Sequence, residues 1–463
     1  MKERHIKHLY WRAGFGVDIN EFKKIKNFPK RKILNKLFRS SKKSVDIDID
    51  LSEFSSIKNK TPRQLRKELG ESVYRKLRQK SQGKVRDLSY AWIDKLAFSE
   101  ELLREKMTLF WANVFVCRDN QIFHIQQYNN TLRRNALGDF RTFVKEIARE
   151  PSMSKYLNNN QNRKKSPNEN FARELMELFT LGVGHYTEQD IKESARAFTG
   201  WSFKNDGTFF LREKRHDYGE KTFFGKKGNF DGDDIIDIIL EQRQCAKFIC
   251  AKIYTYFINP DINEKYLEEI TNEFYRNYDI RNLMYYIFRS DWFYNDENIG
   301  VKIKSPIELL TGIRKVVPVT FNRKRQLSYL QRMMGQVLLY PENVSGWKGG
   351  KSWIDSNTLM FRLKLASLIL NDAVINLEEK GAFEDSFEAY YKRTKKNNKF
   401  IKTTKNWELF NAKYERISSK ELMDFLLITN LDKDTEELLD SLEVKSNRNY
   451  CIQLMSVPEY QLC

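Results

Sequence analysis

Residues 166–201, SPNENFARELMELFTLGVGHYTEQDIKESARAFTGW, carry two helical patterns separated by a glycine-rich turn. Apolar residues recur at three- and four-residue spacings, which predicts helices over 168–181 and 187–199. Gly182 and Gly184 follow the first pattern, where a helix commonly ends on a residue with positive φ. The stretch therefore predicts a helix, a tight turn and a second helix.

The same helical spacing continues through most of the chain. Only 9 Pro and 20 Gly occur in 463 residues, whereas 32 Phe and 22 Tyr supply material for a large core. We therefore expect a mainly α fold with a multi-helix orthogonal or bundle-like body. The expected helices cover residues 20–38, 61–82, 87–116, 129–149, 233–257, 263–276, 279–290, 305–316, 324–339, 358–371 and 384–394, with short ones after 419.

Two stretches interrupt this helical pattern. Asp206-Gly207 lies between apolar runs, which predicts a β-hairpin insertion over 201–225, and residues 219–225 are expected to add a third short strand. Residues 45–51 alternate apolar with Asp, which is typical of an edge strand. The expected organisation is a main helical domain over 1–370, a linker-like region over 371–405, and a C-terminal helical extension over 406–463 that packs on the body.

Positive charge is concentrated in a basic insert at residues 23–86. Residues 23–43 hold ten Lys or Arg and no acid, and residues 58–86 hold eleven against Glu68 and Glu71, so these windows account for the whole net charge of +19. A solvated helical face is one explanation, and binding of nucleic acid or another polyanion is the alternative. Signatures of the common nucleic-acid-binding motifs are missing from the sequence.

The acidic residues near the helix starts have a structural explanation. Ser166-Pro167-Asn168-Glu169 and Ser305-Pro306-Ile307-Glu308 have the spacing of a capping box with proline at the first helical position. Residues 187–190 form a looser version of the same pattern. We therefore expect Glu169 and Glu308 to cap helices rather than to catalyse a reaction.

The polar side of the 168–181 helix is the candidate site. Asn170, Arg173, Glu174 and Glu177 share that side, while the flanking segments are apolar and aromatic. A salt-bridged solvent face is one explanation. The other is a polar ligand-binding or hydrolytic site in which Arg173 binds an anionic group and Glu174 or Glu177 acts as a base.

Further candidates come from the segment that follows the second helix. His216 and Asp217 are expected to lie beside Glu174 and Glu177, where the four side chains could share a divalent cation. The remaining candidate ligand-binding residues are Arg196, Trp201 and Lys221. The sequence contains neither HExxH nor ExxH, so the metal content stays open.

Ordered motifs along nearly the whole chain resemble the bacterial family catalogued as domain of unknown function 1800. They are HLYWRAGFG (residues 8–16), NENFARELMELFTLGVGHYTEQD (168–190), HDYGEKTFFG (216–225), KIKSPIELL (302–310), YPENVSGWKGG (340–350) and MSVPEYQL (455–462). The resemblance implies histidines in the motif that reads FWANVF here (110–115), where this chain has none. It also implies a non-catalytic assembly role beside a sulfatase-like protein encoded nearby, as an alternative to a ligand-binding site.

The cysteines and the hydropathy limit the remaining possibilities. The chain has five cysteines and no CxxC pair, so neither a disulfide framework nor a zinc knuckle is expected. The sequence has no run of about 18 apolar residues, the length that would predict a membrane span. The segment before residue 8 lacks an apolar signal region, so a cytoplasmic location is expected, or an exported one if a leader is missing.

Overall fold

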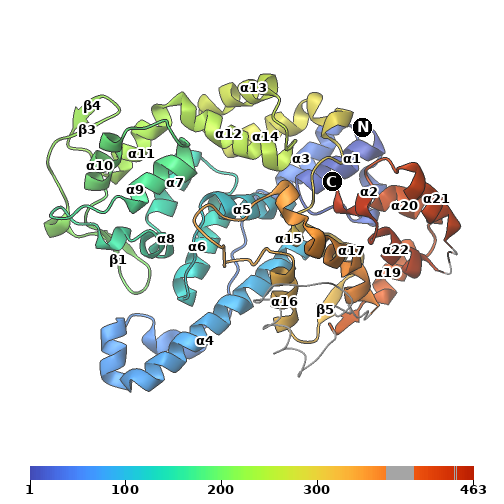
Figure 1. Cartoon of the computed structure of the whole chain (residues 1–463), viewed down its shortest axis with the longest axis horizontal. Coiled ribbons are helices and arrows are strands. Elements are labelled where there is room, and N and C mark those ends of the chain that lie inside the picture. Colours follow the sequence, from blue (N-terminus) through green and yellow to red (C-terminus); the bar gives the residue numbers. More distant parts are fainter. Residues whose placement is uncertain (372–400, 443, 445) are drawn as a thin grey trace. The chain divides into compact units, whose positions relative to one another are not determined.

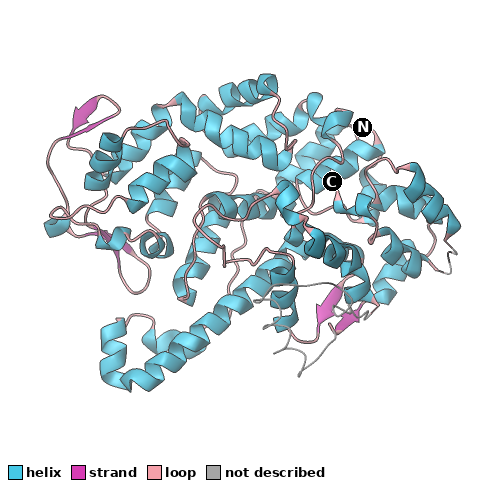
Figure 2. Cartoon of the chain, in the orientation of Figure 1, coloured by secondary structure: helices cyan, strands magenta, loops and turns pink. Residues whose placement is uncertain are grey.

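The computed structural model describes residues 1–371, 401–442, 444 and 446–463. Helices dominate this part of the chain, and its strands form three small antiparallel sheets of two strands each (Figure 2). The mainly α prediction is therefore confirmed. The expected helix at 384–394 and most of the linker-like region at 371–405 lie outside the described residues.

The chain divides into two compact units, which we describe separately. Unit 2 contains residues 29–293 and 338–347. Its helices are α3 Lys30–Ser40, η1 Ser52–Ile57, α4 Pro62–Phe98, α5 Leu102–Val114, α6 Ile122–Asn135, α7 Phe140–Ala148, α8 Pro151–Tyr156, η2 Asn159–Gln161, α9 Asn170–Glu174, η3 Leu175–Thr180, α10 Glu188–Ala197, η4 Glu213–Arg215, α11 Gly232–Glu241, α12 Arg243–Phe257, α13 Glu264–Tyr275 and α14 Ile280–Arg289 (Figure 1).

Unit 1 contains residues 1–28, 294–337 and 348–463. The short η5 Trp292–Tyr294 lies where the chain passes from unit 2 to unit 1. The described elements of unit 1 are α1 Glu3–Arg12, α2 Ile19–Ile25, η6 Asp296–Asn298, α15 Pro306–Val316, β5 Val319–Phe321, α16 Arg325–Met333, η7 Gly350–Trp353, α17 Ser356–Leu370, β6 Thr403–Lys405, α19 Trp407–Tyr414, α20 Ser419–Leu426, α21 Lys433–Ser441, α22 Asn447–Leu454 and η8 Pro458–Gln461.

Aromatic side chains fill the centre of unit 2. Trp111 of α5 is completely buried and contacts the rings of Phe110, Phe115, Phe140 and Phe143. Its indole nitrogen donates to the carbonyl of Ala136 at 3.1 Å, so the one polar atom of the ring is paired. The FWANVF motif therefore forms part of the core.

Several expected helices are broken where the sequence supplies a stop. The predicted helix over 87–116 is two helices, because α4 ends at Phe98 and α5 begins at Leu102. The predicted helix over 129–149 is likewise divided, since Asp139 caps α7 by accepting from the amide of Thr142 at 2.7 Å. The 20–38 pattern is interrupted before Lys30, where Pro29 is the N-cap.

The expected edge strand at 45–51 does not form, although its alternation has a physical role. Ile47 is buried, and side chains of α6 take the place of a neighbouring strand. The amide of Ile47 donates to Asn130 Oδ1 at 2.9 Å and its carbonyl accepts from Asn130 Nδ2 at 3.0 Å, while Gln126 accepts from the amide of Ile49 at 3.3 Å. An extended segment thus pairs with helix side chains instead of a strand.

The hairpin insertion is confirmed in its first half. β1 Trp201–Phe203 pairs with β2 Phe209–Leu211, and Gly207 has a φ of +92° in the turn between them. The segment predicted to add a third strand instead starts a second hairpin, β3 Lys221–Phe223 with β4 Lys226–Gly228. The two hairpins lie in separate sheets.

Unit 1 brings the first and last described segments together. Trp11 of α1 contacts the ring of Tyr460 in η8, and the ammonium of Lys304 lies 3.8 Å from the centre of the Trp11 ring and 3.7 Å from that of Tyr460. The capping box at Ser305 is confirmed, since Glu308 accepts from the amide of Ser305 at 2.6 Å. Glu308 is also buried, and it pairs with Lys302 at 2.8 Å.

Candidate functional site

The helix of the candidate site, predicted over 168–181, contains an irregular second turn. α9 continues directly into η3, whose residues Leu175–Thr180 are π-helical. The hydroxyl of Thr180 donates to the carbonyl of Leu175 at 2.5 Å, and the amides of Leu181 and Gly182 both donate to the carbonyl of Met176. Single π-turns inside helices are rare and are frequent at functional sites. This turn carries Glu177 and follows Glu174.

The predicted capping box at Ser166 is wrong. The helix begins at Asn170, and in the described part of the chain Glu169 makes no capping hydrogen bond. Asn168 Oδ1 instead accepts from the amide of Asn170 at 3.1 Å, and the amide of Asn168 donates to Asn162 Oδ1 at 2.9 Å. The asparagine side chains thus satisfy this end of the helix, which leaves the Glu169 carboxylate available for an ion pair.

Arg173 is engaged by neighbouring carboxylates. It bonds Glu188 at 2.9 and 3.0 Å and Glu169 at 3.2 Å, and the Glu188 contact is the main cause of a raised Arg173 pKa. The side chain is about one-third exposed. These ion pairs favour the explanation that this side of the helix is a salt-bridged solvent face over the explanation that Arg173 binds an anionic group. Asn170 is exposed beside it.

Glu174 and Glu177 are half-buried and lie one turn apart. Burial, and next the charge of Glu177, raise the pKa of Glu174, with Arg173 opposing the shift. Glu174 forms no hydrogen bond or ion pair within the described residues. Glu177 accepts from the hydroxyl of Tyr186 at 2.8 Å, and burial together with that bond raises the Tyr186 pKa to about 12.

The His216–Asp217 segment is held by backbone contacts. His216 is buried, and its Nδ1 donates to the carbonyl of Thr199 at 2.7 Å. The amide of Asp217 donates to the Thr199 hydroxyl at 2.8 Å. A Cβ added to Gly200 would lie 3.0 Å from the backbone nitrogen of His216, so the close approach of these two backbone segments requires glycine. These contacts have a structural role in joining the end of α10 to the hairpin insertion.

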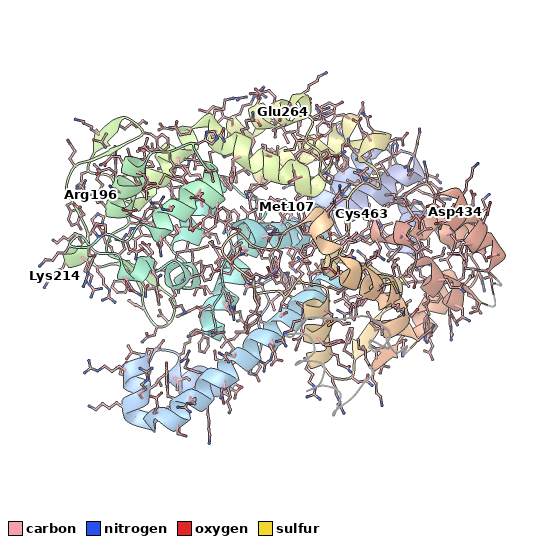
Figure 3. All side chains as sticks on the ribbon, viewed as in Figure 1. Met107, Arg196, Lys214, Glu264, Asp434 and Cys463 are labelled. Carbon is pink, nitrogen blue, oxygen red and sulfur yellow. The ribbon has the colours of Figure 1, made fainter. Side chains whose placement is uncertain are left out.

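The other candidates of this segment also have partners. Arg196, labelled in Figure 3, donates to the Asp217 carboxylate at 2.8 Å and to Glu193 at 2.8 Å. Lys221 is buried and donates to the carbonyl of Asp217 at 2.6 Å and of Gly219 at 3.0 Å. The structure therefore brings Arg196, Asp217 and Lys221 together as a satisfied network.

Two predictions remain, a ligand-binding role for Trp201 and a divalent cation shared by four side chains. Trp201 is buried and contacts the rings of Phe198 and Phe209, with the Arg149 guanidinium 5.5 Å from its ring centre. In the part of the chain that the structure describes, no three His, Cys, Asp or Glu side chains gather closely enough to hold a metal ion. The four-residue cation site with His216 and Asp217 therefore does not form.

The structure also shows a polar network that the sequence patterns did not indicate. The Lys155 ammonium donates to Nδ1 of His124 at 2.8 Å and pairs with Asp119, which also accepts from the Ser152 hydroxyl at 3.0 Å. His124 Nε2 donates to the carbonyl of Asn205 at 3.0 Å. Burial, with the Lys155 charge, lowers the His124 pKa to about 4. A neutral imidazole thus links α6 and α8 to the β1–β2 turn.

Asn113 was missed as well. Its Oδ1 accepts from the amide of Trp347 at 2.7 Å and its Nδ2 donates to the carbonyl of Trp347 at 3.1 Å. A Cβ on Gly346 would lie 2.3 Å from Asn113 Oδ1. The sequence could have indicated a role for this side chain, because Asn113 is the single polar residue of FWANVF. The resemblance implied histidines in this motif, and its residues Ala112 and Val114 are buried and apolar.

These features define a mainly helical protein that has a carboxylate pair at a π-turn and several fully paired polar networks. The family model described as "Protein of unknown function (DUF1800)" matches residues 8–462, and the chain belongs to this family. Neither the curated proteins nor the solved structures contain a match. Within the described residues, no helix is long and apolar enough to cross a membrane.

Proposed function

We propose that this DUF1800 protein binds a polar ligand at the α9–η3 turn and hydrolyses it with Glu174 and Glu177. The observation that carries the proposal is the half-buried carboxyl of Glu174, whose pKa is raised and which lacks a hydrogen bond within the described residues. Five other residues predicted from the sequence already form hydrogen bonds with protein groups, namely Arg173, Arg196, His216, Asp217 and Lys221.

The chemistry follows from two neighbouring carboxyl groups in different surroundings. Glu174, protonated to a higher pH than an ordinary glutamate, donates a proton to the leaving group. Glu177, held by the Tyr186 hydroxyl, accepts a proton from the attacking water. One proton thus enters the product and one leaves the water, so both carboxyl groups must exchange protons with solvent before the next turnover.

The experiment is a screen of the full-length protein against ester, amide, phosphate-ester, sulfate-ester and glycoside model substrates. Glu174→Gln should abolish any activity found, whereas Glu241→Gln, an exposed ion-paired glutamate, is the matched control and should retain it. Activity should fall as pH rises through the raised pKa of Glu174, because the acid form is then lost. Equal activity in wild type and Glu174→Gln would refute the proposal.

Polyanion binding is a second candidate, favoured by the exposure of α4. From Pro62 to Lys80 nearly every side chain is exposed, Leu65 being the buried exception, and this part of α4 projects from the rest of unit 2 (Figure 1). Gly70, with a φ of +78°, kinks the helix. Five cations of this part of α4 have no ion pair within the described residues, namely Arg63, Lys67, Arg75, Lys76 and Arg78.

Heparin chromatography tests this second candidate. Arg75→Glu/Arg78→Glu should elute at lower salt than wild type, because the variant loses two cations that would pair with the polyanion and gains two repelling carboxylates. Retention that does not weaken with salt would rule it out. Assembly with a sulfatase-like neighbour stays a prediction from the resemblance, tested by co-purification of the two proteins from cells that express both.

A further inference from the structure

The loop that follows α5 is held where several parts of unit 2 meet. Phe115, the C-cap residue of α5, contacts the ring of Phe179 in η3, with the ring centres 5.5 Å apart. Asn113 of α5 bonds the backbone of Trp347, which places the end of the 338–347 segment against the same helix. The loop therefore begins beside both the π-turn of the candidate site and the 338–347 segment.

Helix α8 holds the other end of this loop. The carboxylate of Asp119 accepts from the Ser152 hydroxyl at 3.0 Å and pairs with the ammonium of Lys155. Cys117, two positions earlier, is buried. Arg118 lies between these two residues in the chain, so the backbone that carries it is fixed on both sides.

The Arg118 side chain itself is exposed and has no carboxylate partner. Within the described residues its guanidinium forms no hydrogen bond or ion pair. It contacts the ring of Tyr340, with the guanidinium carbon 5.2 Å from the ring centre. An arginine that lies over an aromatic ring still presents the N–H groups at its edge. This planar fork matches the two oxygens of a carboxylate or a phosphate.

The residue before Tyr340 has an unusual backbone conformation. Leu339 has a φ of +66°, in the left-handed region that bulky residues rarely adopt. Its side chain is buried, so packing keeps the backbone in this conformation. Such positions persist only where the surrounding structure enforces them, and they are concentrated at ligand sites. The conformation of Leu339 sets the course of the chain into Tyr340.

Tyr156 of α8 connects Arg118 to the carboxylates of the candidate site. Its side chain is half-buried, and its hydroxyl forms no hydrogen bond in the described part of the chain. Burial and then Cys117 raise the pKa of Tyr156, the charge of Arg118 opposes this shift, and the charge of Glu174 adds to it. The Tyr156 hydroxyl is therefore within electrostatic reach of both Arg118 and Glu174.

An anionic substrate needs a cation at this site. The charges of Glu174 and Glu177 would repel it, and Arg173 is already bonded to two other glutamates. Arg118 has the charge and the donors to offset this repulsion, and no carboxylate among the described residues competes for them. The anion-binding role that the sequence suggested for Arg173 is therefore better suited to Arg118.

We propose that Arg118 binds an oxyanion group of the ligand, a carboxylate or a phosphate, beside Glu174. Tyr340 positions the guanidinium, and the Tyr156 hydroxyl donates a further hydrogen bond to the same group. The inference rests on the proposed function and deepens it, because it makes the substrate of Glu174 and Glu177 an anion. Binding of the oxyanion to Arg118 does not itself require hydrolysis.

Saturation-transfer NMR of the full-length protein with methyl phosphate and with acetate tests the proposal, since the method detects weak binding. Methanol and acetamide are the neutral probes and should receive no saturation. Arg118→Met should weaken binding of the anion roughly tenfold or more, the loss expected for a charge-assisted hydrogen bond. Arg118→Lys, which keeps the charge without the fork, should weaken it less. Arg31→Met, which removes an exposed and unpaired arginine of α3, is the matched control and should bind as wild type.

Tyr340→Leu tests the positioning of the guanidinium. It should weaken anion binding about twofold to fivefold in the wild-type background and have no effect in Arg118→Met, because the ring acts through Arg118. An equal effect in both backgrounds would show a general structural role and would contradict the role assigned to Tyr340.

Glu174→Gln tests the link to the carboxylates. At pH 8 it removes a negative charge, so methyl phosphate should bind more tightly than to wild type. An unchanged affinity would place the anion away from Glu174 and overturn the inference. So would anion binding that Arg118→Met leaves intact, equal transfer to the neutral probes, or no transfer to either anion.

The result also separates this inference from the proposed function. Anion binding that depends on Arg118, together with no hydrolysis of any model substrate, would remove the hydrolytic function and leave the anion site in place. Hydrolysis of neutral and anionic substrates with equal kcat/KM, unaffected by Arg118→Met, would overturn this inference and leave the hydrolytic function in place.

Discussion

Glu150 provides the sharpest test of the electrostatics of this structure. It is the N-cap residue of α8, only 4% exposed, and it accepts from the Thr131 hydroxyl at 2.6 Å. Burial raises its pKa to about 7, outweighing the hydrogen bonds from Thr131 and Gln127 that lower it. The folded protein thus holds this carboxyl protonated over a pH range in which the unfolded chain ionises it.

The sign and size follow from linkage. Because the folded pKa is raised, the stabilisation is complete below the ordinary value of 4.5 and is lost as pH rises to about 7. A difference of that size corresponds to about 3 kcal/mol in the free energy of unfolding. Glu150→Gln stays neutral and can still accept from Thr131. The variant should match wild type near pH 4 and exceed its stability by about 3 kcal/mol at pH 8.

Urea denaturation between pH 4 and 8, followed by circular dichroism, measures this difference, with Glu241→Gln as a control for an exposed glutamate. The comparison should use the unfolding transition of unit 2, which contains Glu150, because the two units need not unfold together. If wild type and Glu150→Gln lose stability in parallel over this pH range, the burial argument for this carboxyl is refuted.

The remaining predictions concern three contrasting contacts. Asn113→Ala removes both bonds to the backbone of Trp347, so it should cost about 1–3 kcal/mol and increase proteolytic cleavage near residue 347. Glu308→Gln removes the buried partner of Lys302 and should lower the free energy of unfolding by about 3–5 kcal/mol, measured by urea denaturation. Arg173→Ala breaks surface ion pairs and should cost under about 1 kcal/mol; a larger loss would show that Arg173 supports the fold.

The sequence predicted helices where local chemistry and tertiary contacts agree. At Ser305 the capping box forms as expected, with Glu308 also satisfying Lys302. At Ser166 the same pattern failed, because Asn162 and Asn168 provide competing hydrogen bonds that no local spacing reveals. Residues 45–51 similarly have a strand pattern whose partner turned out to be a helix, since Asn130 offers both a donor and an acceptor.

The sequence predicted which side chains share the polar side of the α9–η3 helix, but not which groups they pair with. Periodicity placed Glu174 and Glu177 on the polar side of one helix, and the structure keeps them there. The partners of Arg173 and Asp217 come from Glu188 and Arg196, and which of several nearby charges pair depends on how the helices pack. The π-turn could not be predicted from the sequence either, because its extra residue does not visibly disturb the spacing of the apolar residues.

The contact of Trp11 and Lys304 with Tyr460 has a consequence for synthesis of the protein. Residues 29–293 are nearly all of unit 2 and emerge from the ribosome without interruption. Tyr460, in contrast, is made about 450 residues after Trp11, a delay of roughly 20–90 s at ordinary elongation rates. The part of α1 that Tyr460 covers therefore stays uncovered until the segment around residue 460 has been made. The Trp11 face of α1 is thus completed long after α1 itself is made, so it is a segment on which a chaperone could act during synthesis.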